Sequence, residues 1–377
     1  MIETLARLVS IDSVNPEWGG PGEAGVAAFV AERLESWGAE VWVDEVLPGR
    51  PNVIARAAGR DSSRAIVLEA HTDTVSVEGM TIPPFVPGRR QGNLYGRGAC
   101  DTKGGLAAMM EAIRGLVSGN HPPPCDVYLA AVVDEEHAFR GVLAALRWFA
   151  AHGITPEAAI VAEPTECRLV TANKGVLRFR IETAGRAAHS SKPHLGINAI
   201  TRMAPVIQAV ESYHATLARQ AHPLTGPPTG SVTLIEGGQQ INFVPSRCSI
   251  GIDRRMIPGE TAEQVLEDYR RAVAPWEGTE IVRPPTLVDE ASETPPEAAV
   301  VRTGRDVLAA MALPAEPAGV PFGCDVTKFT RAGIPGVIFG PGSIDQAHAD
   351  VEFVPIAEVT SAAEFYRRFA LAYGTAR

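Results

Sequence analysis

With 377 residues, 45% of them hydrophobic, the chain is longer than one ordinary hydrophobic core supports, so we expect a globular protein of two domains. Its net charge of −10 and the lack of a basic stripe argue against nucleic-acid binding, and no apolar run approaches the roughly 18–20 residues of a membrane span. The five cysteines are scattered without a Cys-x-x-Cys pair, and the N-terminus lacks the pattern of a signal peptide, so we expect a cytoplasmic protein without a disulfide framework or a thiolate zinc site.

The pattern of apolar residues predicts helices and strands in an order typical of an α/β protein. Helical spacing predicts helices at 3–10, 22–37, 106–117 and 141–152, and alternation predicts strands at 41–46 and 52–56. Four nearly continuous apolar runs, at 65–70, 126–133, 158–162 and 336–339, predict strands. Such runs are typical of parallel strands buried on both faces. We therefore expect a mostly parallel sheet covered by helices.

Acidic residues or histidines follow each of these four apolar strands. Open α/β sheets bind ligands beyond the carboxyl ends of their strands. Unpaired carboxylates would be costly to bury at one edge of a sheet, so a purely structural explanation is weak. In strand order the residues are His71 and Asp73, then Glu135 and Glu136, then Glu163, and finally His348 in a Gly/Pro-bounded loop.

Asp101 lies in a glycine-rich loop, Gly96–Gly105, just before the predicted helix at 106–117. The glycines allow the backbone to approach a ligand closely. An aspartate before a helix is also a common N-cap, and this stretch alone does not separate the two interpretations. The acidic strand ends elsewhere in the chain favour a ligand site.

Two histidines and several carboxylates without a thiolate suit Zn²⁺, or Co²⁺ or Mn²⁺ in its place. A central Asp101 could bridge two ions roughly 3.5–4 Å apart, and such a site lowers the pKa of water to roughly 7. His71 and Asp73 stand two apart, so Asp73 can orient the imidazole. Glu135 and Glu136 point in different directions, which suits one metal ligand and one proton-transfer group. The alternative for this pair is a solvated acidic helix start.

The middle of the chain has a different pattern, which predicts an inserted α+β domain. We place this insert at 174–285, with its exit in the Pro-rich stretch 284–296, and we assign 1–173 and 286–377 to the other domain. The predicted elements of the insert are strands at 175–183, 231–235, 248–253 and 280–282 and helices at 196–217 and 261–273.

Several motifs follow one another along the chain from about residue 5 to residue 360. They are His71-Thr-Asp-Thr-Val, Gly96-Arg-Gly-Ala-Cys-Asp-Thr-Lys-Gly-Gly, Asp134-Glu-Glu, Glu163-Pro-Thr, Gly185-Arg-Ala-Ala-His-Ser-Ser-Lys-Pro, Ile241-Asn-Phe-Val-Pro and Gln346-Ala-His-Ala-Asp. As an ordered set they resemble the dinuclear zinc amidohydrolase/peptidase family. That family contains acetylornithine deacetylase, succinyl-diaminopimelate desuccinylase, aminoacylase and carboxypeptidase G.

The resemblance implies a parallel-sheet catalytic domain that binds two Zn²⁺ ions, with an inserted ferredoxin-like domain for dimerisation or as a lid. It implies that Asp101 bridges the ions. His71 and Glu163 would complete one metal site, and Glu136 and His348 the other. Glu135 would be the general base and acid, with Asp73 orienting His71.

The resemblance also assigns substrate contacts to the insert. His189 would reach the substrate carbonyl, often across a dimer interface formed by the insert domains, and would help to stabilise the oxyanion. Asn242 and Arg255 match positions that contact substrate, and Arg255 could grip a carboxylate with its guanidinium. Arg254 is a rival for that role, and either arginine could be only a surface ion pair.

We therefore expect metal-dependent hydrolysis of an amide bond in an N-acyl amino acid or small peptide-like substrate with a free carboxylate, as in acetylornithine deacetylases and desuccinylases. One loop departs from the members that act in amino-acid pathways: Pro321–Val326 contains Cys324 where they carry a Gly-Gly-Thr-like or Ser/Thr-containing sequence. The alternatives are a metallo-aminopeptidase or carboxypeptidase acting on di- or tripeptides, and a non-catalytic metal or amino-acid binding protein. The last would have no use for Glu135.

Overall fold

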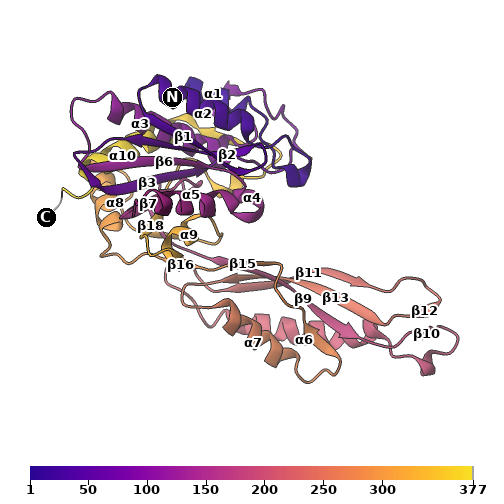
Figure 1. Cartoon of the computed structure of the whole chain (residues 1–377). Helices are drawn as coiled ribbons and strands as arrows, with labels where there is room; N and C mark the ends of the chain where they lie inside the picture. The colour runs from indigo at the N-terminus through magenta and orange to yellow at the C-terminus, as the bar shows by residue number, and fades with distance from the viewer. Residues whose placement is uncertain (376–377) are drawn as a thin grey trace. The chain divides into compact units, whose positions relative to one another are not determined.

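A computed structural model of the protein describes residues 1–375, and these form two compact units (Figure 1). The sheet unit contains Met1–Thr171, Thr294–Ala318 and the described residues from Cys324 on. The insert unit contains Ala172–Glu293 and Gly319–Gly323. In the described part of the chain, none of the helices has the length and apolar character needed to cross a membrane.

The sheet unit is built on one large, mostly parallel sheet, as predicted. Its strands follow the order β1-β2-β6-β3-β7-β18-β8-β16, and β17 also pairs with β8. Strand β3 runs parallel to both β6 and β7, and β18 runs parallel to β7. The strands are β1 (Glu40–Leu47), β2 (Arg50–Ala57), β3 (Asp61–His71), β6 (Cys125–Val132), β7 (Ala158–Val161), β8 (Val170–Asn173), β16 (Ser292–Glu293), β17 (Ala318–Val320) and β18 (Gly336–Ile338). By residue number, β16 and parts of β8 and β17 fall within the insert unit.

Helices cover both faces of this sheet (Figure 1). Apolar side chains of α2, α3, α8 and α10 form one continuous core with the sheet, whereas α5 and α9 pack on the other face. On that second face Trp42 and Tyr128 contact Trp148 of α5 through their rings. The helices are α1 (Ile2–Val9), α2 (Ala24–Ser36), α3 (Gly104–Val117), α4 (Glu135–Ala138), α5 (Arg140–Ala151), α8 (Ala299–Ala310), α9 (Val326–Arg331) and α10 (Ile356–Ala372).

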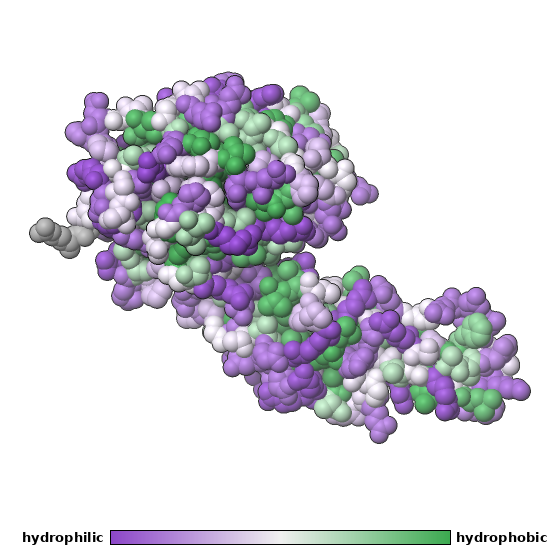
Figure 2. All heavy atoms as spheres, in the orientation of Figure 1, coloured by the Kyte–Doolittle hydropathy of each residue, from purple (hydrophilic) through white to green (hydrophobic). Residues whose placement is uncertain are grey.

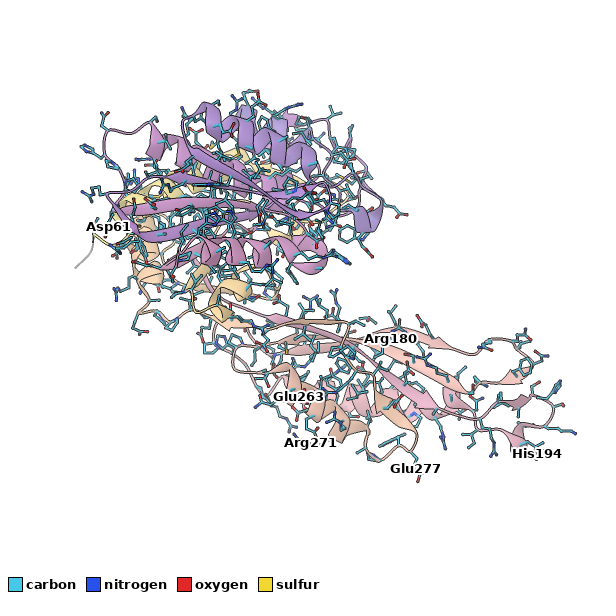
Figure 3. The ribbon with its side chains drawn as sticks, in the orientation of Figure 1. Asp61, Arg180, His194, Glu263, Arg271 and Glu277 are labelled. Carbon is cyan, nitrogen blue, oxygen red and sulfur yellow. The ribbon has the colours of Figure 1, made fainter. Side chains whose placement is uncertain are left out.

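The insert unit has a separate antiparallel sheet in the order β11-β13-β9-β14, with β15 also paired to β9. Helices α6 and α7 lie on one face (Figure 1), where they enclose a second apolar core. Glu263 and Arg271 are exposed on α7 (Figure 3). This arrangement confirms the predicted α+β insert. Its main elements are β9 (Gly175–Ala184), α6 (Ala199–Leu217), β11 (Thr229–Gly237), β13 (Arg247–Met256), α7 (Ala262–Val273), β14 (Thr279–Ile281) and β15 (Leu287–Asp289).

Several short strands were not predicted, because two or three residues are too few to show an alternating pattern. A small sheet joins β19 to β5 and β5 to β4, and a two-stranded ribbon pairs β10 with β12 in the insert unit. Their bounds are β4 (Gly88–Arg90), β5 (Asn93–Tyr95), β10 (Ala188–His189), β12 (Phe243–Val244) and β19 (Phe353–Pro355).

Candidate metal centre

The carboxyl ends of the parallel strands bring the predicted acids and histidines together. His71 is the last residue of β3, and Glu163 follows the end of β7 by two residues. Glu136 lies in α4, which begins shortly after β6 ends. Because these strands are parallel, all three side chains start from the same edge of the sheet.

Asp101 lies at the centre of this group. Its Oδ1 atom is 2.9 Å from Nε2 of His71, and its Oδ2 atom is 3.3 Å from Nε2 of His348. Helix α3 begins only at Gly104, so the carboxylate faces the two histidines instead of capping the helix. The peptide bond between Asp101 and Thr102 is cis.

Two clusters of possible ligand atoms share Asp101. In each of them the ligand atoms lie within 4.8 Å of one another. Since one oxygen of Asp101 faces each histidine, the carboxylate is placed to serve both clusters at once. The first cluster is His71, Asp101 and Glu163, and the second is Asp101, Glu136 and His348.

The electrostatics of the two clusters fit divalent cations. Burial and then the charge of Asp101 raise the pKa of Glu136 to about 7, and the same two causes raise the pKa of Glu163 well above its usual value. Hydrogen bonds to Asp101 and then to Glu136 raise the pKa of His348 to about 11. Buried carboxylates crowded in this way are costly unless positive charge compensates them. Nitrogen and oxygen donors without thiolate are the ligands expected of hydrolytic Zn²⁺, Co²⁺ or Mn²⁺ sites.

Asp73 contacts more of the site than the sequence predicted. Nδ1 of His71 lies 3.1 Å from the backbone oxygen of Asp73 and 3.5 Å from its Oδ1 atom. The carboxylate of Asp73 also accepts hydrogen bonds from the backbone N–H groups of Glu135 (3.1 Å) and Glu136 (3.2 Å). One buried carboxylate therefore holds the imidazole and the start of α4 together.

The turn before α4 is held by a buried polar network. Asp134 adopts a left-handed conformation (φ 65°), which is uncommon for residues other than glycine. Its carboxylate accepts from Nδ2 of Asn15 at 3.0 Å and from Arg50 at 2.9 Å. Its backbone N–H donates to Glu23, which itself accepts two bonds from Arg50. This closed ring of contacts fixes the direction in which the next residue, Glu135, leaves the sheet.

Glu135 is buried, yet its carboxylate makes no hydrogen bond with any residue in the described part of the chain. Burial raises the pKa of Glu135 well above its usual value, opposed by the charge of His71. A carboxylate next to the two clusters and free of protein partners is available to accept a proton from water.

The predicted substrate-contacting residues lie in the insert unit. His189 is exposed on β10, and its Nδ1 atom accepts a hydrogen bond from the backbone N–H of Ser191 at 3.1 Å. Asn242 is exposed just before β12 and receives a hydrogen bond on its backbone oxygen from Ser190 at 3.0 Å. The β10–β12 ribbon therefore brings His189 and Asn242 into neighbouring positions.

The two candidate arginines lie on opposite faces of the insert sheet. Arg254 pairs in register with Leu177 of the apolar core, and its fully buried side chain bonds Glu260 at 2.6 Å. Arg255 is partly exposed and pairs with Asp253 at 2.8 Å. Arg180, which is labelled in Figure 3, lies on the same face as Arg255, because it pairs with Gly251, four residues before Arg255 in β13. Of these two arginines, only Arg255 has a guanidinium that is accessible to a ligand.

Four buried polar residues near the site had no predicted role. Glu69 and Asp325 are buried carboxylic acids that lie close to each other. Burial, and then the charge of Asp325, raise the pKa of Glu69 well above its usual value. Asn15 and Glu352 bind the loops that carry the candidate ligands. For Glu69 a signal was present, since it is an acid within the apolar strand that ends at His71.

Known proteins resemble this chain over almost its full length. An acetylornithine deacetylase of Proteus mirabilis is 30% identical over 369 residues, covering 94% of this chain and 92% of the relative. A second one, from Myxococcus xanthus, is 31% identical over 375 residues, covering 94% of this chain and 93% of the relative.

Solved structures share the fold. The aminopeptidase PepT of Bacillus cereus superposes with a TM-score of 0.80 at 21% identity and covers 99% of this chain and 98% of that one. The metallo-carboxypeptidase Sso-CP2 of Sulfolobus solfataricus gives a TM-score of 0.79 at 20% identity, with coverage of 99% and 98%.

The model of the peptidase family M20/M25/M40 matches residues 67–372. This match spans both units and confirms the resemblance seen in the motifs. It also accounts for the two ligand clusters at the carboxyl ends of the strands, since the family implies a dinuclear metal site. The chain belongs to the peptidase family M20/M25/M40 and is a metallohydrolase of the amidohydrolase and peptidase type.

Proposed function

We propose that this protein hydrolyses the amide bond of an N-acyl amino acid that bears a free carboxylate, in the manner of an acetylornithine deacetylase. The observation that carries the proposal is the position of Asp101, whose two oxygens face His71 and His348 separately. The relatives named acetylornithine deacetylase, at 30% and 31% identity over nearly their whole length, support the deacylase over the peptidase alternative.

Two divalent ions, Zn²⁺ in the first place and Co²⁺ or Mn²⁺ as alternatives, would be held by the two clusters that share Asp101. When bound, such ions lower the pKa of water and polarise a carbonyl oxygen. His71 would be kept in the correct tautomer by Asp73: with Nδ1–H donating to the backbone oxygen of Asp73, Nε2 presents its lone pair to the site.

Glu135 would carry the protons of the reaction. Its carboxylate has no hydrogen-bond partner among the described residues, and it lies close enough to His71 of the first cluster and to Glu136 of the second for their charges to act on it. It would take a proton from the attacking water and then pass one to the departing amine, which makes that group a better leaving group. Asp73 holds the backbone of Glu135 in place during both transfers.

His189 is suited to donate a hydrogen bond to the carbonyl oxygen. A backbone N–H can only donate, so the bond from Ser191 requires Nδ1 of His189 to be the acceptor. In the neutral ring the proton then sits on Nε2 of this exposed side chain. An N–H donor of this kind stabilises the negative charge that develops on the oxygen during attack.

We further propose that the insert acts as a lid and dimerisation domain, so that His189 and Arg255 meet the substrate. Strand β11 is an edge strand of its sheet, and apolar side chains reach the surface of the insert unit among polar ones (Figure 2).

The five cysteines are buried and unpaired, which supports a reducing compartment such as the cytoplasm.

The proposal is tested with metal-depleted protein and a panel of N-acetyl, N-succinyl, N-formyl and N-carbamoyl amino acids together with dipeptides and tripeptides. We expect turnover of N-acyl amino acids after addition of Zn²⁺ or Co²⁺. Cleavage restricted to peptides with a free α-amine would establish the aminopeptidase alternative instead. Two bound ions per chain with no turnover across the panel would contradict the substrate class.

A Glu135→Gln variant separates an enzyme from a binding protein. We expect a fall in kcat of at least roughly 10²–10⁴-fold, with the metal content unchanged. The matched control is Glu35→Gln, at an exposed position of α2. Unaltered turnover in Glu135→Gln would refute the assigned role of Glu135.

A further inference from the structure

Glu352 is fully buried and lies four residues after the candidate ligand His348. In the described part of the chain, the hydrogen bonds of its carboxylate all go to a single loop, the one that leads to Asp101. Oε2 accepts hydrogen bonds from Nη1 of Arg97 at 2.7 Å and from the backbone N–H of Gly98 at 3.0 Å. Oε1 accepts from the backbone N–H groups of Cys100 at 2.9 Å and Asp101 at 3.1 Å.

All four partners are hydrogen-bond donors, so the ionised carboxylate of Glu352 can accept from each of them. Buried backbone N–H groups outside regular structure must find partners. A single carboxylate supplies them here, as a charged acceptor whose bonds are stronger than those of neutral groups. The last of these bonds ends on the backbone of Asp101 itself.

Glu352 also extends a strand pairing that joins the two segments. Strand β19 pairs with β5 in register, with Phe353 opposite Tyr95. The backbone N–H of Gly96 then donates to the backbone oxygen of Glu352 at 3.1 Å. The segment after β5 leads on to Asp101, and the segment before β19 leads back to His348.

His348 needs such support because its own surroundings hold it loosely. Its side chain is 51% exposed, and among the described residues its Nε2 atom pairs only with Asp101 (3.3 Å) and Glu136 (3.1 Å), the two other members of its cluster. Its backbone has a positive φ of 61°. The segment after it is fastened by the bond from Thr81 to the backbone oxygen of Asp350 at 3.0 Å and by Glu352.

We propose that Glu352 is a positioning residue that sets the spacing between Asp101 and His348, and thereby the affinity of the second cluster for its metal ion. This inference rests on the proposed metal centre. It predicts that a change at Glu352 acts on the cluster of Asp101, Glu136 and His348, and leaves the ligation by His71 and Glu163 largely intact.

The test is direct measurement of Zn²⁺ and Co²⁺ binding to metal-free full-length protein by titration calorimetry and chelator competition. In Glu352→Gln, one oxygen becomes an N–H₂ group that faces two donors, so half of the contacts to the loop are lost. We expect one of two binding steps to weaken by roughly 10–100-fold, the usual effect of removing a group that supports a metal ligand.

Two single-site backgrounds identify the step. In Glu163→Gln only the His348 cluster keeps all its ligands, and there Glu352→Gln should weaken binding. In Glu136→Gln only the His71 cluster does, and there the same change should weaken binding less, because His71 and Glu163 lie in segments that Glu352 does not bond. Equal weakening in both backgrounds, or in neither, would overturn the proposal.

Asp126 offers a matched control for general loss of stability. It is a buried carboxylate that accepts from Arg56, a backbone N–H and Ser62, and it lies at the opposite, amino end of β6. Asp126→Asn should leave both binding steps unchanged.

If Glu352→Gln does not fold, Glu352→Asp, which keeps the charge but has a shorter side chain, is measured in the same way. Wild-type protein that binds fewer than two ions would refute the metal centre itself, a result distinct from two ions with unaltered binding in the variant.

Discussion

Nδ2 of Asn15 donates a 2.8 Å hydrogen bond to Oδ2 of Asp73, and both side chains are buried. The same Nδ2 donates to Asp134 at 3.0 Å. A single amide group thus links the carboxylate that holds His71 to the left-handed residue that precedes Glu135. Without this donor the two carboxylates would face each other with like charge, and the start of α4 would lose its fixed direction.

We therefore expect Asn15→Leu to lower kcat by roughly 10–100-fold while KM and the content of bound metal stay close to wild type. Steady-state kinetics with metal analysis checks this. The matched control is Asn52→Leu: Asn52 is also buried and bonds the backbone of Val133 and Gly141 around the same turn, but it touches no carboxylate. An equal loss of kcat in both variants would mean that Asn15 only stabilises the turn.

The two neighbouring arginines of β13 should respond differently to substitution. Arg255→Lys keeps the charge but loses the paired donors of the guanidinium. We expect KM to rise by roughly 10–100-fold, the value of charged hydrogen bonds, with a smaller effect on kcat. A substrate analogue without its carboxylate should bind wild type and variant alike.

Arg254→Met should act on stability instead. Removing one member of a buried ion pair is strongly destabilising. Because Glu260 keeps 17% of its side chain exposed, we expect a loss of about 3 kcal/mol in the free energy of unfolding, at the low end of that range. Urea unfolding measures it. A change in KM without a loss of stability would reverse the assignment of the two arginines.

The sequence predicted most of the candidate centre because parallel strands place their carboxyl ends at one edge. That rule alone brings His71, Glu136 and Glu163 together. Arg254 could also have been assigned from the sequence: Ile250 and Ile252 alternate toward the core, and the same period places Arg254 on the buried face. The information was present in the alternation of one strand.

Other residues of the centre could not be found in this way. Asn15 bonds partners 58 and 119 residues away, and Glu352 bonds a loop more than 250 residues before it. Neither residue lies in a patterned helix or strand. Their roles follow from tertiary contacts between loops, and local periodicity contains no record of such contacts.

Metal-free protein should become less stable as the pH rises. In the folded state the pKa of Glu136 is about 7 instead of its usual 4.5, and the pKa of His348 is about 11 instead of 6.5. Between its unfolded-state pKa and its folded-state pKa, each group binds more protons in the folded state than in the unfolded state. The stabilisation is therefore complete at low pH and is lost as the pH rises. The loss from Glu136 falls between pH 4.5 and 7.

Urea unfolding after chelation, at pH 5, 6, 7 and 8, checks this dependence. Glu136→Gln should flatten the part of the slope between pH 5 and 7. The stabilisation by added Zn²⁺ should instead increase with pH, because Zn²⁺ binding displaces these protons. Metal-free protein whose stability rises from pH 5 to 8 would contradict the charge arrangement of the centre.

Strand β11 provides the test of dimerisation. Its residues Leu234 and Ile235 are 54% and 61% exposed on an edge strand, a position that proteins usually protect against pairing with another chain. If two copies pair through this edge, Ile235→Lys should convert a dimer into a monomer. Light scattering during gel filtration measures the mass, and Val86→Lys, at a residue 69% exposed in the sheet unit, is the matched control.

The monomeric variant should also lose activity if His189 acts on the substrate bound by the partner, because the donor would then be missing from every site. A monomer with full activity would refute the cross-subunit role of His189 while leaving the metal centre unaffected.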